Sequence, residues 1–162
     1  YLCELTDRAL PDAEPQPEVF ELLLWSLQAL ILAPDGAALV HSYELRLLAA
    51  LGYQPVLDRC ARTGHELGGE VAWFSPAAGG LVQESERQPG EVALEVSPKA
   101  VRALRRLLDP VGYGVDLLQT TIPDDLLPVV RAVNLAQVRY YLETEPKSAE
   151  FLAQLRALEG RP

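Results

Sequence analysis

The first third of the chain pairs helical patterns of apolar residues with proline-rich breaks. Residues 1–10 show one apolar helical face, and three prolines within residues 11–17 prevent that helix from continuing. Pro17 suits the first position of a second helix, which ends at the Pro-Asp-Gly sequence of residues 34–36. Its apolar stripe repeats every 3.6 residues and is broad, so we expect this face to be largely buried. The stripe consists of Phe20, Leu23, Leu24, Leu27, Leu30 and Ile31.

A third helix is predicted directly after this break. Asp35 is a plausible N-cap, and Gly52 is a suitable terminating residue at the other end. The short connection favours two antiparallel helices. The apolar positions of this third helix are Leu39, Val40, Tyr43, Leu47, Leu48 and Leu51.

The pattern changes between residues 53 and 96. This stretch is rich in glycine and lacks a helical stripe, and it contains three short β-like runs at 71–74, 80–82 and 92–96. We therefore predict a small β-rich insert within the helical chain.

Helical periodicity returns at Ser97 and Pro98, which read as an N-cap and a first-turn proline. The helix that follows is ended by residues 110–113, and another begins at about Asp124 or Pro128 and runs to Leu142. A last helix is expected after residue 148. The predicted fold class is thus mainly α, a compact bundle of about six helices with one β-rich insert. Inward positions of the last helix are Phe151, Leu152, Leu155 and Leu158.

Composition is that of an ordinary globular domain, with 49% hydrophobic and 23% charged residues in a chain of 162. The formal net charge of −9 repels a polyanion, so nucleic-acid binding must depend on a local basic patch. The apolar run at 22–33 is too short for a bilayer span, and the first ten residues show no signal peptide. We expect a cytoplasmic protein, and a chain that starts inside a larger one.

Catalytic and metal-binding signals are weak. The chain has two cysteines and two histidines, too few for a disulfide framework or a four-thiolate metal site. Cys60 and His65 could form a nucleophile pair, but a structural loop thiol is the simpler interpretation. We therefore expect no cofactor, no metal and no enzymatic activity, with a thiol-dependent enzyme as the unfavoured alternative.

Basic residues cluster on one predicted helix, where Arg102, Arg105 and Arg106 follow Lys99. Arg131 and Arg139 lie on the next long helix. If the two helices pack side by side, these residues could line a cationic groove for phosphates or an acidic peptide. The alternative is a solvated helix face that balances the acidic residues, and the residues alone favour this second interpretation.

Several short motifs follow one another along nearly the whole chain. They are residues 1–11, Tyr43-Glu44-Leu45-Arg46-Leu47-Leu48 with Leu51-Gly52-Tyr53, residues 57–60, residues 74–81, and residues 139–142 with 147–148. Each motif is weak by itself. Together and in this order they resemble the C-terminal helical domain of the bacterial recombination mediator RecO, with residues 1–11 similar to its start and residues 43–53 similar to one of its helices.

This resemblance implies that residues 1–162 form the helical domain of a mediator whose N-terminal OB-fold is absent from this chain. Such proteins bind single-stranded and duplex DNA, anneal complementary strands and bind RecR. They also engage the acidic tail of single-stranded-DNA-binding protein to help load RecA. The resemblance also implies a cytoplasmic protein that is associated with the nucleoid. A purely structural scaffold for the OB-fold and the RecR contact is the alternative.

Two departures from the family pattern stand out. Relatives often carry four cysteines in the insert, whereas here the matching positions are Cys60, Thr63, Gln83 and Glu86, so we expect an insert without zinc. Relatives often have Arg at the position of His41. This difference puts binding of the acidic tail of single-stranded-DNA-binding protein at this position in doubt, or makes such binding dependent on pH. Candidate DNA-binding or peptide-binding residues are Arg46, Arg102, Arg105, Arg106, Arg131, Arg139 and His41.

Overall fold

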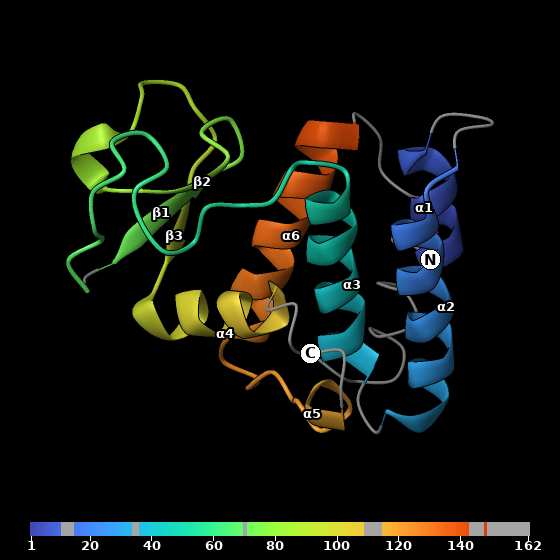
Figure 1. Ribbon diagram of the computed structural model, residues 1–162. Coiled ribbons are helices and arrows are strands. Elements are labelled where there is room, and N and C mark those ends of the chain that lie inside the picture. The colour runs from blue at the N-terminus through green and yellow to red at the C-terminus, as the bar shows by residue number, and fades with distance from the viewer. Residues whose placement is uncertain (11–14, 34–35, 70, 109–114, 143–147, 149–162) are drawn as a thin grey trace.

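A computed structural model describes residues 1–10, 15–33, 36–69, 71–108, 115–142 and 148. Within that part, five helices of two turns or more accompany the single-turn helix α5 and one small sheet (Figure 1), which confirms the mainly α class. The helix expected after residue 148 lies outside the described residues. The helices are α1 (Leu2–Ala9), α2 (Pro17–Leu32), α3 (Gly36–Ala50), α4 (Pro98–Leu108), α5 (Val115–Leu118) and α6 (Leu127–Leu142).

Helix α3 is the centre of the domain and contacts each of the other helices. In Figure 1, α1 and α2 lie on one side of it, while α6 and the sheet lie on the other. Two apolar cores form around α3, each with residues from both α2 and α6. Helix α3 contributes Leu39 and Leu45 to one core and Leu47 and Leu48 to the other. It ends at Gly52 as predicted, since Gly52 adopts φ 87° and Tyr53 N–H donates to Leu48 O (2.7 Å).

The insert holds a three-stranded antiparallel sheet of order β2-β1-β3. Its strands are β1 (Ala72–Ser75), β2 (Gly80–Val82) and β3 (Leu94–Val96), and the short helix η1 (Glu84–Glu86) follows β2. Phe74 of β1 pairs with Leu81 on one side and Leu94 on the other, and its side chain is fully buried. A Cβ atom at Gly80 would overlap the backbone of Val56, so only glycine fits where the chain after α3 crosses the sheet.

The buried face of α2 differs from our expectation. Val19, Leu22, Ser26 and Ala29 are buried, whereas most of the predicted stripe faces outward. The prediction was wrong because apolar residues occur on all sides of this helix, so the pattern does not distinguish one face from another. The exposed positions are Phe20, Leu24, Leu27 and Ile31.

A polar network connects three helices beneath the surface. The carboxylate of Glu44 on α3 accepts hydrogen bonds from Tyr1 Oη, His41 Nδ1 (2.7 Å) and Asn134 Nδ2 (2.8 Å). Asn134 on α6 also donates to the backbone oxygen of His41 (2.9 Å). Burial raises the pKa of Glu44, but the hydrogen bond and attraction of His41, together with Tyr1 and Asn134, lower it below its ordinary value. Glu44 is therefore a buried carboxylate with its acceptor sites occupied.

Replacing Glu44 by Gln should destabilise the fold at neutral pH, because the new amide N–H group meets donors rather than acceptors. We expect a loss of about 1.5–3 kcal/mol in the free energy of unfolding, the range for hydrogen bonds to a charged group. Since folding lowers the pKa of Glu44, the advantage of the natural chain is complete above the ordinary carboxyl pKa of 4.5. It disappears as the pH falls toward the lower folded-state pKa.

Urea unfolding of the natural chain and of the Glu44→Gln variant between pH 7 and pH 3 measures this difference. Glu21→Gln is the matched control, because it makes the same chemical change at an exposed position. A difference between Glu44→Gln and the natural chain that stays constant over this pH range would contradict the prediction.

Candidate functional site

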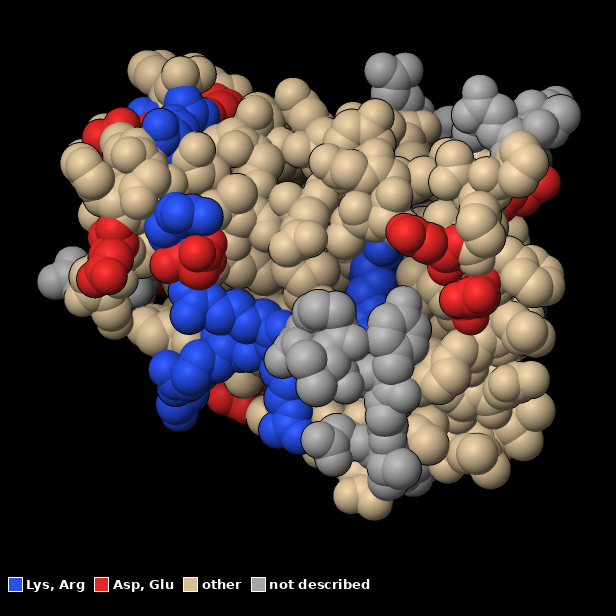
Figure 2. Space-filling model, viewed as in Figure 1, with Lys and Arg blue, Asp and Glu red and all other residues tan. Residues whose placement is uncertain are grey.

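Helix α4 presents its basic side chains to solvent. It begins at Pro98, with Ser97 as the predicted N-cap, whose Oγ accepts the Ala100 N–H (3.3 Å). Val101, Leu104 and Leu107 are buried, so the positions between them face outward. Figure 2 shows Lys and Arg side chains gathered around α4. The exposed cations of this helix are Lys99, Arg102, Arg105 and Arg106.

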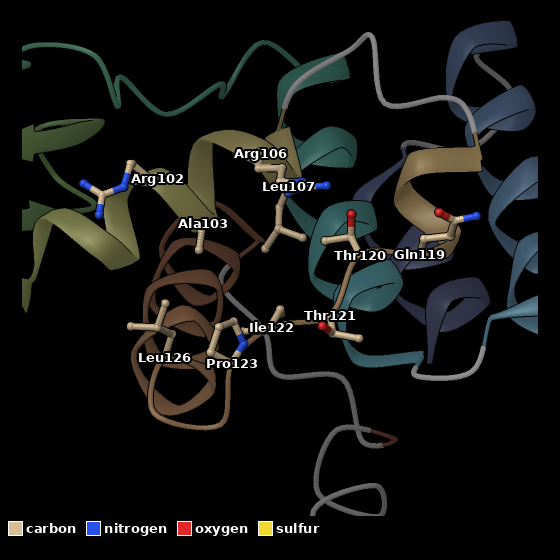
Figure 3. A pocket seen from close by; sticks show the side chains of 10 residues that line it. All are labelled: Arg102, Ala103, Arg106, Leu107, Gln119, Thr120, Thr121, Ile122, Pro123 and Leu126. Carbon is tan, nitrogen blue, oxygen red and sulfur yellow. The ribbon is translucent and has the colours of Figure 1, made fainter.

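A groove of about 350 Å³ lies between α4 and the segment that connects α5 to α6. Its apolar lining comes from both sides, with Leu107 on α4 and Ile122 on the opposite segment (Figure 3). Arg102 and Arg106 stand at its α4 side, and the Arg102 guanidinium points outward. The remaining lining residues are Ala103, Gln119, Thr120, Thr121, Pro123 and Leu126.

This combination of an apolar floor and a cationic edge suits a ligand that has an apolar end and carboxylates beside it. The apolar end loses water-exposed surface in the groove, while guanidinium groups form charge-assisted hydrogen bonds with carboxylates. Arg102 and Arg106 are exposed, so they meet such a ligand without prior burial. Thr120 and Thr121 add hydroxyl groups opposite the arginines.

Arg105 has a different environment from its two neighbours. Its Nε and Nη2 atoms donate to the backbone oxygen of Leu57, at 2.7 and 2.5 Å. Leu57 lies in the chain between α3 and the sheet, so Arg105 ties α4 to the insert. Its guanidinium group is thus engaged within the domain, and Arg105 is not among the lining residues of the groove.

The other predicted site residues lie apart from the groove. Arg46 and His41 are buried in α3, with exposed fractions of 5% and 3%, and His41 contacts Glu44. Arg131 is half-buried and lies near Tyr1. The pKa of Tyr1 is raised above its ordinary value by burial and by Glu44, and Arg131 partly opposes this rise. Arg139 is exposed toward the other end of α6. Of the predicted site residues, the structure therefore places only Arg102 and Arg106 at the groove.

Sequence reasoning missed the half of the groove that lies opposite α4. Residues 119–126 show no apolar periodicity, and before α6 they form turns and irregular backbone rather than a regular element. Ile122 is nevertheless buried and packs against the main core. In this segment, Pro123 and the two acidic residues after it indicate the N-terminus of a helix, and they do not indicate a binding surface.

Two of the degenerate cysteine positions, Thr63 and Gln83, lie beside the buried thiol of Cys60 in the insert. Burial raises the pKa of Cys60, but hydrogen bonds from the Thr63 side chain and from the backbone of Thr63, Gln83 and Arg62 lower it below the ordinary value. His65 contributes its backbone oxygen, which accepts the Cys60 N–H (2.8 Å). Within the described residues, no group of three His, Cys, Asp or Glu side chains is arranged to hold a metal ion.

Packing and charge contacts connect the loops of the insert with its sheet. Arg62 forms an ion pair with Glu91, across the sheet region from one loop to another. The Arg87 guanidinium lies 3.7 Å from the centre of the Trp73 ring, a cation–π contact. Together with the buried Phe74, these contacts hold both ends of the insert against the sheet.

The chain is similar to known proteins along nearly its whole length. A family model described as "Recombination protein O C terminal" matches residues 1–133. A DNA repair protein RecO of Dehalococcoides mccartyi is 30% identical over 156 residues, which cover 96% of this chain and 60% of the relative. The RecO proteins of Roseiflexus sp. and Symbiobacterium thermophilum are each 33% identical, covering 98% and 97% of this chain. The chain thus spans about 60% of the length of these relatives.

Restoring the three missing thiols should create a zinc site. The triple substitution Thr63→Cys, Gln83→Cys and Glu86→Cys supplies four thiolates with Cys60, the set that tetrahedral structural zinc prefers. We expect one tightly bound zinc per chain and a higher unfolding temperature with the metal, measured by elemental analysis and calorimetry.

The same triple variant with Cys60→Ser is the control, and it should lose most of the zinc affinity. Tightly bound zinc in the natural chain would contradict the expectation of an insert without metal. A triple variant that folds but takes up no zinc would show that the four positions do not converge.

Proposed function

The chain belongs to the family of recombination protein O C-terminal domains, and on that premise we propose that it acts in DNA repair and recombination. Within the longer protein, this chain serves as a protein-interaction module with auxiliary DNA binding. The naming of its relatives as DNA repair proteins supports this role. None of the helices in the described part of the chain has the length and apolarity needed to cross a bilayer.

In this proposal the complete protein is a mediator that works without catalysis at the nucleoid, in the cytoplasm. It anneals complementary strands and helps load RecA onto DNA coated by single-stranded-DNA-binding protein, with RecR as a further partner. An N-terminal OB-fold in the remaining length supplies the strand-binding groove, since such folds combine a basic groove with stacking aromatics. Residues 53–96 form the β-rich insert of this domain, a zinc ribbon without its ligands.

The net charge of −9 determines how this domain can contribute to DNA binding. A few exposed arginines on an acidic domain neutralise few phosphates, so the isolated domain binds DNA weakly and loses that binding quickly as salt rises. Most of the affinity for DNA therefore comes from the OB-fold. The acidic domain contributes chiefly through protein partners.

The groove beside α4 is the observation that carries the interaction role. The tail of single-stranded-DNA-binding protein is acidic and ends in an apolar residue, which matches a cationic edge beside an apolar floor. In the proposed complex, tail carboxylates pair with Arg102 and Arg106. The terminal aromatic group enters between Leu107 and Ile122.

Changes to the groove should weaken binding of an acidic peptide that ends in Phe. Arg106→Ala removes one guanidinium and should raise the dissociation constant about five- to tenfold at low salt. Ala103→Trp places a large ring in the groove and should weaken binding more, with little change in salt dependence. Fluorescence anisotropy of the labelled peptide against the whole chain measures both.

Lys99→Ala is the matched control, because it removes one exposed positive charge from the same helix outside the groove. An equal loss in Lys99→Ala and Arg106→Ala would mean that binding is general charge attraction. Undetectable binding at high micromolar concentration by the folded chain would remove the docking proposal and favour the alternative, a scaffold for the OB-fold and RecR.

A further inference from the structure

The groove beside α4 has an acidic edge opposite its two lining arginines. Pro123 and Leu126 line the groove on the side away from α4. They are the two ends of a tight turn, because the Leu126 N–H donates to the Pro123 backbone oxygen at 2.9 Å. Asp124 and Asp125 form the tip of this turn, and both side chains are exposed. The groove therefore lies between a cationic helix and an acidic turn.

The two aspartates are close enough to act on a ligand in the groove. Each is the direct neighbour of a lining residue, and consecutive Cα atoms are about 3.8 Å apart. Charges interact with little screening within the Debye length, which is about 10 Å at 0.1 M salt. Figure 2 shows acidic atoms directly below the basic cluster around α4. A ligand on the apolar floor thus meets positive charge from α4 and negative charge from the turn.

We propose that Asp124 and Asp125 determine specificity, by keeping nucleic acid out of a groove that admits an acidic peptide. A nucleic-acid strand carries a phosphate at every nucleotide, so a strand laid along the groove places negative charge beside the turn as well as beside α4. Placing like charges together is a general way to reject a wrong partner.

A peptide with an apolar end and neighbouring carboxylates can avoid this repulsion. Its carboxylates pair with Arg102 and Arg106, and only apolar and backbone groups then lie beside the turn. The distinction is needed because guanidinium groups bind phosphates as well as carboxylates. This inference rests on the proposed peptide docking, and it adds the reason why DNA does not compete for the same arginines.

The same two aspartates have a structural role that must be separated from this one. They directly precede α6, and acidic residues near a helix N-terminus are stabilising. Asn is as suitable as Asp at the start of a helix, so the double substitution Asp124→Asn with Asp125→Asn removes both charges and leaves the fold in place. If the role is structural alone, this variant changes stability and leaves the affinity for DNA unchanged.

Fluorescence anisotropy of a labelled single-stranded oligonucleotide at 50 mM salt tests the proposal. The Asp124→Asn, Asp125→Asn variant of the whole chain should bind the oligonucleotide about fivefold more tightly than the natural chain. Adding Arg106→Ala should reverse this gain, which places the oligonucleotide in the groove. The matched control is Asp7→Asn with Glu21→Gln, which removes two exposed acidic charges from α1 and α2 and should change the affinity less than about twofold.

The same variants are then titrated with the acidic peptide that ends in Phe. The affinity of the Asp124→Asn, Asp125→Asn variant for this peptide should rise less than about twofold, since the carboxylates of the peptide lie toward α4. The natural chain should therefore prefer peptide over DNA more strongly than the variant does. Circular dichroism and urea unfolding verify that every variant is folded.

An unchanged affinity of the Asp124→Asn, Asp125→Asn variant for the oligonucleotide overturns the proposal. An equal gain in the Asp7→Asn, Glu21→Gln control also overturns it, as does a gain that persists with Arg106→Ala or one that is as large for the peptide. Failure of the peptide to bind any of the chains contradicts the proposed function instead. The oligonucleotide measurements need no peptide, so they decide the role of the turn in either case.

Discussion

The burial of one carboxylate in the middle of the domain constrains the arrangement of its helices. Glu44 lies on α3, the helix that contributes to both apolar cores. The side chains that donate hydrogen bonds to its carboxylate come from the start of the chain, from α3 itself and from α6. An unpaired charge at this depth is costly, so each donor must be in position when the cores close. The network thereby connects the start of the chain with α3 and α6, and it disfavours any packing of these parts that leaves the Glu44 carboxylate without its donors.

Different interactions stabilise the insert and the helical core. The core combines apolar packing with the buried network, whereas the insert is small and its sheet has only three short strands. Such a unit ordinarily needs a staple, often a metal. In this insert the side chain of Phe74 is buried, Arg62 pairs with Glu91, and Arg87 lies over the Trp73 ring, while the Cys60 thiol is hydrogen-bonded within its loop.

Local signals predicted much of the fold, and long-range features were the ones they missed. Gly52 and Ser97 end and begin their helices as expected, because capping depends on neighbouring backbone atoms. The buried face of α2 was predicted wrongly, since a helix with apolar residues on all sides has no pattern that selects a face. For the groove, the cationic half was visible in the spacing of Arg102 and Arg106. Its other half needs the position of residues 119–126 against α4, which no short segment encodes.

The contact of Arg105 with Leu57 divides the positive charge of α4 between two uses. Arg105 donates both of its hydrogen bonds to the chain that leads into the insert, whereas Arg102 and Arg106 of the same helix line the groove. A count of exposed cations on this helix therefore overstates the charge that a ligand in the groove would meet. Removing the Arg105 side chain takes a contact from the insert and leaves the lining of the groove complete.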